Sequence, residues 1–272
     1  MVNHPHSTPL SAPPPHAAPV PAALLLAAAV LAAALALAAP GAQAETLFGV
    51  YAGAGTWQQS FSGGIASGGE KIDVEDDLDV NDDANNVFYA ALEHGVPVLP
   101  NVRMNYADVS GSGRNLLTRS VEFNGQVFTL SEDVASEVNL TQTDLVAYYE
   151  VLDNTLSLDV GVAARWVDGD VEVASASEVA GAKFEGVLPL VYARTRFDLP
   201  FTGLWVGGEA MGLAYDGHQL LDANAQLGWE SPLGLGAEIG WRTLRLDLDD
   251  IDEIDSADID ISGPYAALNF HF

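Results

Sequence analysis

The sequence predicts an all-β protein, an antiparallel up-and-down β-barrel that spans a membrane with ten strands, or with eight as the second choice. Three observations predict it. Segments of alternating apolar and polar residues recur through residues 45–272. Long polar connections alternate with short ones that carry turn residues. Residues 1–44 have the composition of a secretion signal.

Segment 155–166 shows the alternation most clearly. One face is apolar and the other is small or charged: Leu156, Leu158, Val160, Val162, Ala164 and Trp166 against Ser157, Asp159, Gly161, Ala163 and Arg165. The other expected strands are 47–58, 86–94, 101–109, 140–151, 187–198, 203–215, 221–230, 233–242 and 262–272. Lipid offers no hydrogen-bond partners, so a spanning sheet has to close on itself. Apolar side chains then face lipid and polar ones face the lumen.

The connections support this arrangement. The short ones carry turn residues: Gly95-Val96-Pro97, Asp153-Asn154, Asp198-Leu199-Pro200 and Ser231-Pro232. The long ones are expected as acidic extracellular loops near 60–85, 110–137, 167–185 and 247–260. The alternating Asp-Ile-Asp run in the last is equally compatible with extended strand. An even number of strands places both ends of the barrel at the tight turns, on the periplasmic side.

Residues 1–44 contain no Asp, Glu, Lys or Arg. Ala22 to Ala39 is an unbroken run of Ala, Leu and Val, and Ala42-Gln43-Ala44 supplies the small residues that a signal peptidase requires. We therefore expect a signal peptide over 1–44, cleaved after Ala44, and a barrel domain over 45–272. An uncleaved transmembrane anchor is the alternative.

Composition excludes several classes of function. The chain has no cysteine, which removes disulfides, thiol nucleophiles and thiolate metal sites. The formal charge of −28 excludes nucleic acid as a partner, because phosphate binding needs clustered Lys and Arg. No Gly-x-Ser-x-Gly motif and no P-loop are present, so no enzyme activity is expected. A protease at the rim, using Asp216 and His218, is the weakest alternative.

The faces expected to point inward are rich in charge. They carry acids and bases together: Glu93, Arg103, Asp144, Glu150, Asp159, Arg165, Arg194, Arg196, Glu209, Asp222, Glu238 and Arg242. An unpaired buried charge is costly, so we expect salt bridges that fill a narrow bore. The alternative is a narrow pore for small solutes.

The acidic loops could hold Ca²⁺ or Mg²⁺, which prefer oxygen ligands. The weak candidates follow the opening of a calcium loop: Asp77, Asp79, Asn81 and Asp83. The glycine position of such a loop holds Asp82 and the closing glutamate position holds Phe88, so this is not an EF-hand. No other cofactor is expected.

The last expected strand ends with aromatic residues on one face. Phe270 and Phe272 lie on that face and Leu268 extends it. This pattern resembles the C-terminal signature that the barrel-assembly machinery recognises. The expected partners are therefore this machinery and outer-membrane lipid, and the chain is expected to be a monomer.

Residues 73–106 contain the most specific pattern in the chain. Asp73-Val-Glu-Asp-Asp-Leu78, Asn85-Asn86-Val87 and Glu93-His94-Gly95-Val96-Pro97-Val98-Leu99-Pro100-Asn101-Val102-Arg103 resemble a proteobacterial family of small outer-membrane β-barrel proteins of uncharacterised function. Gly95 stands where the family carries Pro. The resemblance implies a barrel in the outer membrane of a Gram-negative bacterium and implies no activity.

Four functions remain as hypotheses. The first is a structural or surface-interaction barrel whose lumen is filled with charge, and the second is a narrow pore or transporter. A rim enzyme and a soluble ligand-carrying barrel follow. The soluble barrel would need an apolar interior, whereas the charged faces carry too many groups to bury outside a wet lumen.

Overall fold

The computed structural model describes residues 48–66, 68, 70–251 and 254–272, so the expected signal peptide over 1–44 lies outside the described residues. Its elements are β1 (Phe48–Ala66), β2 (Ile72–Asp73), β3 (Asp83–His94), β4 (Asn101–Leu116), β5 (Val121–Phe123), β6 (Gln126–Phe128), β7 (Asp133–Leu152), β8 (Leu156–Ala174), β9 (Val179–Asp198), β10 (Leu204–Tyr215), β11 (His218–Glu230), β12 (Leu235–Ile251) and β13 (Ile254–His271). Within these residues no helix is long and apolar enough to span a bilayer.

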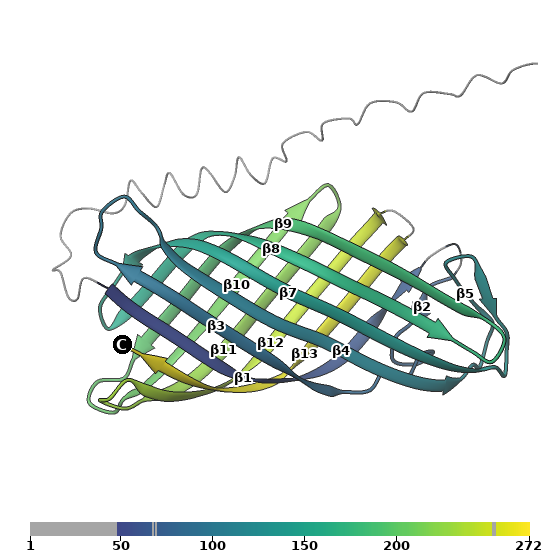
Figure 1. Cartoon of the computed structure of the whole chain (residues 1–272), viewed down its shortest axis with the longest axis horizontal. Coiled ribbons are helices and arrows are strands. Elements are labelled where there is room, and N and C mark those ends of the chain that lie inside the picture. Colours follow the sequence, from purple (N-terminus) through teal and green to yellow (C-terminus); the bar gives the residue numbers. More distant parts are fainter. Residues whose placement is uncertain (1–47, 67, 69, 252–253) are drawn as a thin grey trace, which may run out of the picture.

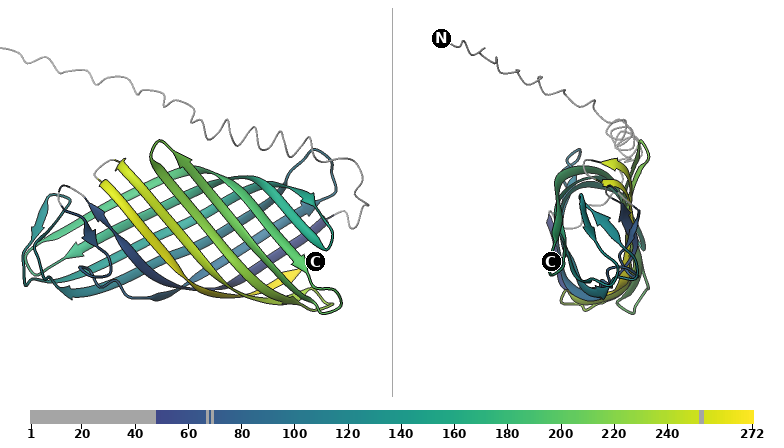
Figure 2. Two further views of the ribbon diagram at one scale, coloured as in Figure 1. Left: turned by 180° about the vertical axis from the view of Figure 1, so that it is seen from behind. Right: turned by 90° about the vertical axis from the view of Figure 1, so that its right-hand side faces the viewer.

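Ten of the described strands form a closed antiparallel barrel. Each pairs with its neighbour in the order β1-β3-β4-β7-β8-β9-β10-β11-β12-β13, and β13 pairs back to β1 from Tyr51↔His271 to Ala66↔Ser256. The strands run obliquely to the long axis of the barrel (Figures 1 and 2). The predicted all-β, ten-stranded antiparallel barrel is confirmed.

The barrel divides into two halves along its axis. The turn-side half runs from the tight connections at 95–100, 153–155, 199–203 and 231–234 to the level of Trp166 on β8 and Trp241 on β12. Here the alternation follows the prediction. On β8, Trp166 is exposed on the outer wall, whereas Arg165 and Asp159 are buried inside.

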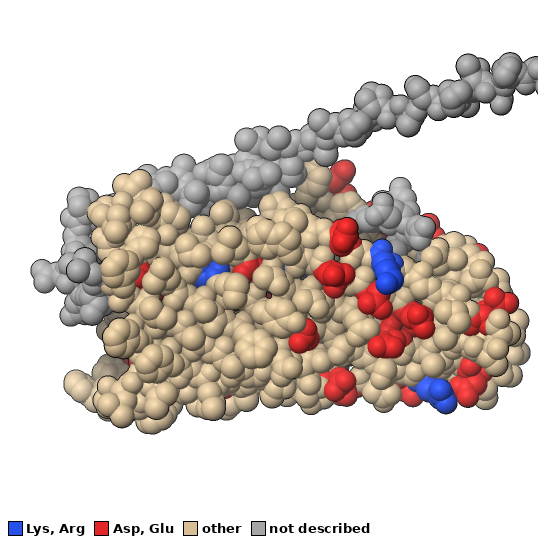
Figure 3. Space-filling view, viewed as in Figure 1, with Lys and Arg blue, Asp and Glu red and all other residues tan. Residues whose placement is uncertain are grey.

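The loop-side half, beyond that level, has the opposite polarity. On β12, Leu244 is buried inside while Arg245 and Asp247 are exposed outside. On β8, Val171 and Val173 are buried while Glu172 is exposed. Figure 3 shows acidic side chains gathered over the half that carries β2 and β5. The period of two continues along each strand, but the apolar residues change from the outer face of the barrel to the inner face.

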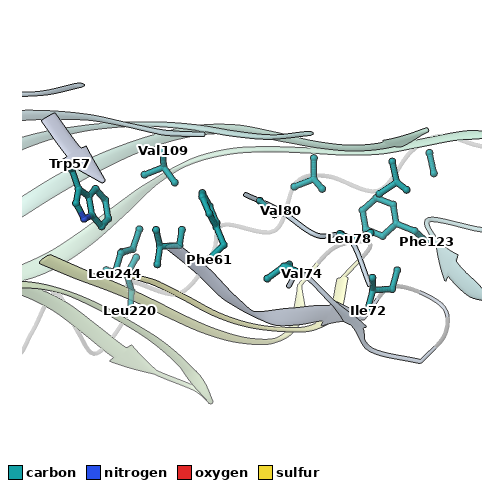
Figure 4. Close-up of a cluster of buried hydrophobic side chains, with 14 of the residues drawn as sticks. Trp57, Phe61, Ile72, Val74, Leu78, Val80, Val109, Phe123, Leu220 and Leu244 are labelled. Atoms are coloured by element: carbon teal, nitrogen blue, oxygen red, sulfur yellow. The ribbon is translucent and has the colours of Figure 1, made fainter. Parts of the chain in front are cut away.

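The loop-side half contains a hydrophobic core, to which its connections contribute. Residues 70–80, between β1 and β3, turn into the loop-side opening of the barrel, which we call the mouth. They bury Ile72, Val74, Leu78 and Val80 there. Figure 4 shows them against Phe61, Val109 and Phe123. The β5–β6 hairpin buries Val121, Phe123 and Phe128 in the same cluster. We call residues 70–80 the plug, and the end-on view shows segments lying across the mouth (Figure 2).

Two of the expected loops are largely strand. β8 runs to Ala174 and β9 begins at Val179, so only residues 175–178 connect them in the stretch expected as a loop over 167–185. Residues 247–251 belong to β12 and 254–260 to β13, which bears out the extended alternative for that run. The strands continue because their apolar residues pack inside the loop-side half instead of facing lipid.

Candidate functional site

The lumen of the turn-side half is the candidate site, and its centre is Arg165. This side chain is fully buried and donates two hydrogen bonds to Asp144 on the neighbouring β7, at 2.7 and 2.9 Å. It also donates to Asp222 on β11, at 2.7 Å, three strands away around the barrel. Arg242 donates to both oxygens of Asp222, at 2.9 and 2.7 Å. The four side chains therefore form one chain of charge-assisted bonds that crosses the bore.

A second crossing lies closer to the tight turns. Arg103 on β4 pairs with Glu209 on β10 at 3.4 Å, and these strands lie almost opposite one another in the barrel. Tyr192 donates to the same carboxylate at 3.2 Å. The Arg103 guanidinium also lies 4.3 Å over the ring of Tyr89, whose hydroxyl donates to Glu238. Aromatic rings thus occupy the space that the ion pairs leave.

The remaining predicted lumenal residues lie toward the turn-side opening. Arg194 approaches Asp159 at 3.9 Å, and Glu93 accepts a hydrogen bond from Tyr148 at 2.8 Å. Arg196 pairs with Glu230 at 3.2 Å and with Asp198. Glu150 is exposed, beside this opening on β7.

The wall of the barrel has a gap in its backbone hydrogen bonding between β3 and β4, which we call the seam. The sequence did not predict it. The ladder between β3 and β4 ends at Val87↔Ala107, although both strands continue. Side chains replace the missing backbone bonds: Gln59 donates to Asp108 O at 2.7 Å and accepts from Ser110 N at 3.2 Å. Asn85 donates to Ser110 O and to Gln59 Oε1. Gln59 and Asn85 stand among inward-facing apolar residues such as Trp57, Phe61 and Val87, and the sequence alone does not place these two polar residues at one seam.

The plug is held by Arg119, which sequence reasoning also missed. Its guanidinium donates to both carboxylate oxygens of Asp77, to Lys71 O at 2.6 Å and to Glu70 at 3.3 Å. The hydrogen bond with Asp77 raises the pKa of Arg119. Asn115 adds bonds to the backbone carbonyls of the plug at Asp76 and Asp77.

The structure does not assemble the weak metal candidates into a site. Asp77 binds Arg119, and Asn81 donates to Asp79 O and Ser112 O. Asp83 accepts from the backbone of the residue that follows it. Across the described residues, no group of three or more His, Asp and Glu side chains is placed to hold a metal ion. His218 Nδ1, in the proposed rim pair with Asp216, accepts from Asp249 N at 3.3 Å.

A small chamber remains in the middle of the lumen. It has a volume of about 70 Å³ and lies between the two crossings. Its lining includes Trp57, Gln142, Asn224 and Glu238 as well as members of both ion-pair groups. Several polar atoms that border it are buried and find no partner among the described residues: Trp57 Nε1, Asn105 Nδ2, Gln142 Oε1 and Asn224 Oδ1.

Comparison with known proteins gives fold-level likenesses. No protein-family model and no curated protein matches the chain, so the resemblance drawn from residues 73–106 stays a prediction. Similar solved structures include the attachment invasion locus protein Ail of Yersinia pestis, at 9% identity and TM-score 0.33, covering 84% of this chain and 100% of that one. The translocator domain of the autotransporter NalP of Neisseria meningitidis has 11% identity and TM-score 0.43, with 93% and 98% covered. The Pseudomonas putida toluene transporter TodX has 9% identity and TM-score 0.33, with 82% and 89% covered. Likenesses this weak carry no argument about activity.

Proposed function

We propose that this chain is an integral outer-membrane β-barrel with an occluded lumen, which acts as a structural or surface-interaction protein and not as an open channel or an enzyme. The observation that carries the proposal is the reversal of polarity along the strands. A wall that is apolar outside at one end and acidic outside at the other fits a barrel that stands partly in lipid and partly in water.

The outer wall of the turn-side half has the features of a lipid-facing belt. From Leu156 to Trp166, eleven residues that rise about 3.4 Å each at a tilt near 40° span roughly 25–28 Å, the height of an outer-membrane apolar band. Exposed aromatic side chains lie at both borders of this belt, as in known barrels: Trp166 and Trp241 at one, and Phe48, Phe197, Trp229 and Phe270 at the other.

The loop-side half would then project from the membrane into water. Its outer wall presents outward-facing acids, including Asp168, Glu172, Glu185, Asp247 and Asp258. Its interior is packed with apolar side chains, so the acids are carried on a folded scaffold and not on loose loops. A fixed acidic surface of this kind favours basic or cationic partners.

The C-terminal strand supports assembly of the barrel as a monomer. Phe270 and Phe272 are both exposed on the outer wall at the turn-side rim. Phe272 also exchanges backbone hydrogen bonds with Val50 on β1, at 2.8 and 2.9 Å. The strand that carries the expected assembly signature is therefore one of the two that close the barrel.

Two experiments test the proposal. Membrane fractionation should recover the protein from the outer membrane, and the detergent-purified protein should migrate differently on gels before and after heating. In planar bilayers we expect at most small and rare openings, because side chains cross the bore at two levels. Steady porin-sized conductance would show that the lumen is open, and recovery as a detergent-free soluble monomer would contradict the membrane location.

A further inference from the structure

We propose that the central chamber of the lumen binds one small monovalent cation of the class of K⁺ or ammonium, held with water beside Glu238. Glu238 is a buried carboxylate without an arginine partner. Among the buried carboxylates that the structure describes, Glu238 has no arginine within 4.0 Å, whereas each of the others has one: Asp77, Asp144, Asp159, Glu209 and Asp222.

The neutral partners of Glu238 do not balance its charge. Tyr89 donates at 3.3 Å and Asn269 at 3.1 Å, and both bonds end on Oε2. The two arginines that line the chamber are engaged elsewhere: Arg103 binds Glu209 and lies over Tyr89, while Arg242 binds Asp222 and lies 4.6 Å over Trp57. Glu238 is only 6% exposed, and a buried carboxylate needs a neutralising group.

The chamber also contains buried polar atoms without partners, and these favour a hydrated cation as the group that neutralises Glu238. A proton on Glu238 would remove its charge, and separate water molecules would then have to donate to the Gln142 and Asn224 oxygens, because a buried acceptor without a partner is costly. A hydrated cation serves both needs, because its water molecules donate to those oxygens. The same waters accept from Trp57 Nε1 and Asn105 Nδ2.

Size and ligand type favour a monovalent ion. A volume of about 70 Å³ holds roughly five water-sized particles at 10–15 Å³ each, enough for an ion and a few waters. Ca²⁺ takes about six to eight oxygen ligands, and Mg²⁺ demands near-ideal octahedral geometry and gives up its waters reluctantly, whereas a single carboxylate is neutralised by a single positive charge. The chamber has one carboxylate that is not paired with arginine, together with amide oxygens.

The test uses full-length protein crystallised in RbCl, with Rb⁺ as the probe. We expect an anomalous peak in the chamber beside Glu238, and its loss in Glu238→Gln, which keeps the shape of the side chain. The matched control is Glu185→Gln, which removes an exposed carboxylate from the outer wall of the loop-side half and should keep the peak. Heat-modified gel mobility of each variant verifies folding.

A measurement in solution tests the same proposal without crystals. The thermal unfolding midpoint of the wild-type protein should be higher in RbCl than in N-methylglucamine chloride of equal ionic strength, and Glu238→Gln should lose this difference. The proposal is overturned if the wild-type chamber has no peak, and a protonated carboxyl band in infrared spectra that Glu238→Gln removes would then identify a proton as the neutralising group. A peak that persists unchanged in Glu238→Gln also overturns the proposal.

Discussion

The two halves of this barrel are built from the same strands, but the interior of the turn-side half is charged and that of the loop-side half is apolar. In the turn-side half, Arg165 is fully buried between carboxylates while Trp166 faces outward. In the loop-side half, Leu244 is buried while Arg245 faces outward. A strand has only two faces, so the medium around the barrel decides which of them carries the apolar residues. Where lipid is outside, the polar side chains must satisfy one another inside.

The halves also differ in how their interiors are held together. The turn-side interior depends on paired charges, which are costly to break because the partner is left buried and unpaired. The loop-side interior depends on apolar burial, which tolerates small changes gradually. The first two predictions compare a substitution in one half with its counterpart in the other, and the last two test contacts within the loop-side half.

The largest effect is expected from Arg165→Met. It leaves Asp144 and Asp222 buried without this partner and should lower the free energy of unfolding by about 3–5 kcal/mol. The counterpart Arg245→Met breaks an exposed pair with Asp260 and should cost no more than about 1 kcal/mol. Denaturant unfolding in detergent measures both. Equal losses would mean that the lumenal network contributes no more than a surface ion pair.

The second-largest effect is expected from a positive charge introduced on the outer wall, which should destabilise the turn-side half and not the loop-side half. Ile239→Arg places a guanidinium in the proposed lipid belt and should cost about 2–4 kcal/mol in a bilayer. The same change at Gln219, exposed on the outer wall of the loop-side half, should stay within about 0.5 kcal/mol. Folding yield and unfolding in lipid vesicles provide the comparison. A tolerated Ile239→Arg would place the belt elsewhere.

A smaller effect is expected at the plug. Arg119→Met removes the bonds to Asp77 and to Lys71 O, and should loosen residues 70–80 at a cost of about 1 kcal/mol, because the pair is partly solvated. Proteinase K should then cleave within the plug before the barrel unfolds. Arg114→Met, at an exposed position on β4, is the control and should leave the cleavage rate unchanged.

The smallest effect is expected from pH, at the loop-side tip. Hydrogen bonds from Ser175, Ser177 and Thr129 lower the pKa of Glu132 from about 4.5 to about 2. The folded pKa is the lower one, so these bonds stabilise the folded tip above pH 4.5 and are lost as the pH falls toward 2. The protection of the backbone amides of residues 175–178 against hydrogen exchange, corrected for the intrinsic pH dependence of the exchange rate, should fall over that window. Glu132→Gln should abolish the pH dependence, and its persistence would assign the effect to another group.

The sequence predicts most of the barrel strands. The differences from the structure lie at the loop-side ends of the strands. Each expected strand is present, and the ends at the tight turns agree within a few residues, as for 155–166 against β8. At the other end β8 continues to Ala174 and β9 begins at Val179 instead of 187. A pattern that is apolar outside and polar inside predicts strand only as far as the outward residues stay apolar, so it does not predict the continuation into the loop-side half.

The sequence by itself determined the alternation, the turns and the charge of the inward faces, because these depend on residues close together in the chain. Only the tertiary structure decided which charges meet across the bore, that Arg119 reaches Asp77, and that Gln59 and Asn85 bridge the β3–β4 seam. These contacts join residues 25 or more positions apart. Their geometry follows from the closure and register of the sheet, which no single segment of the chain specifies.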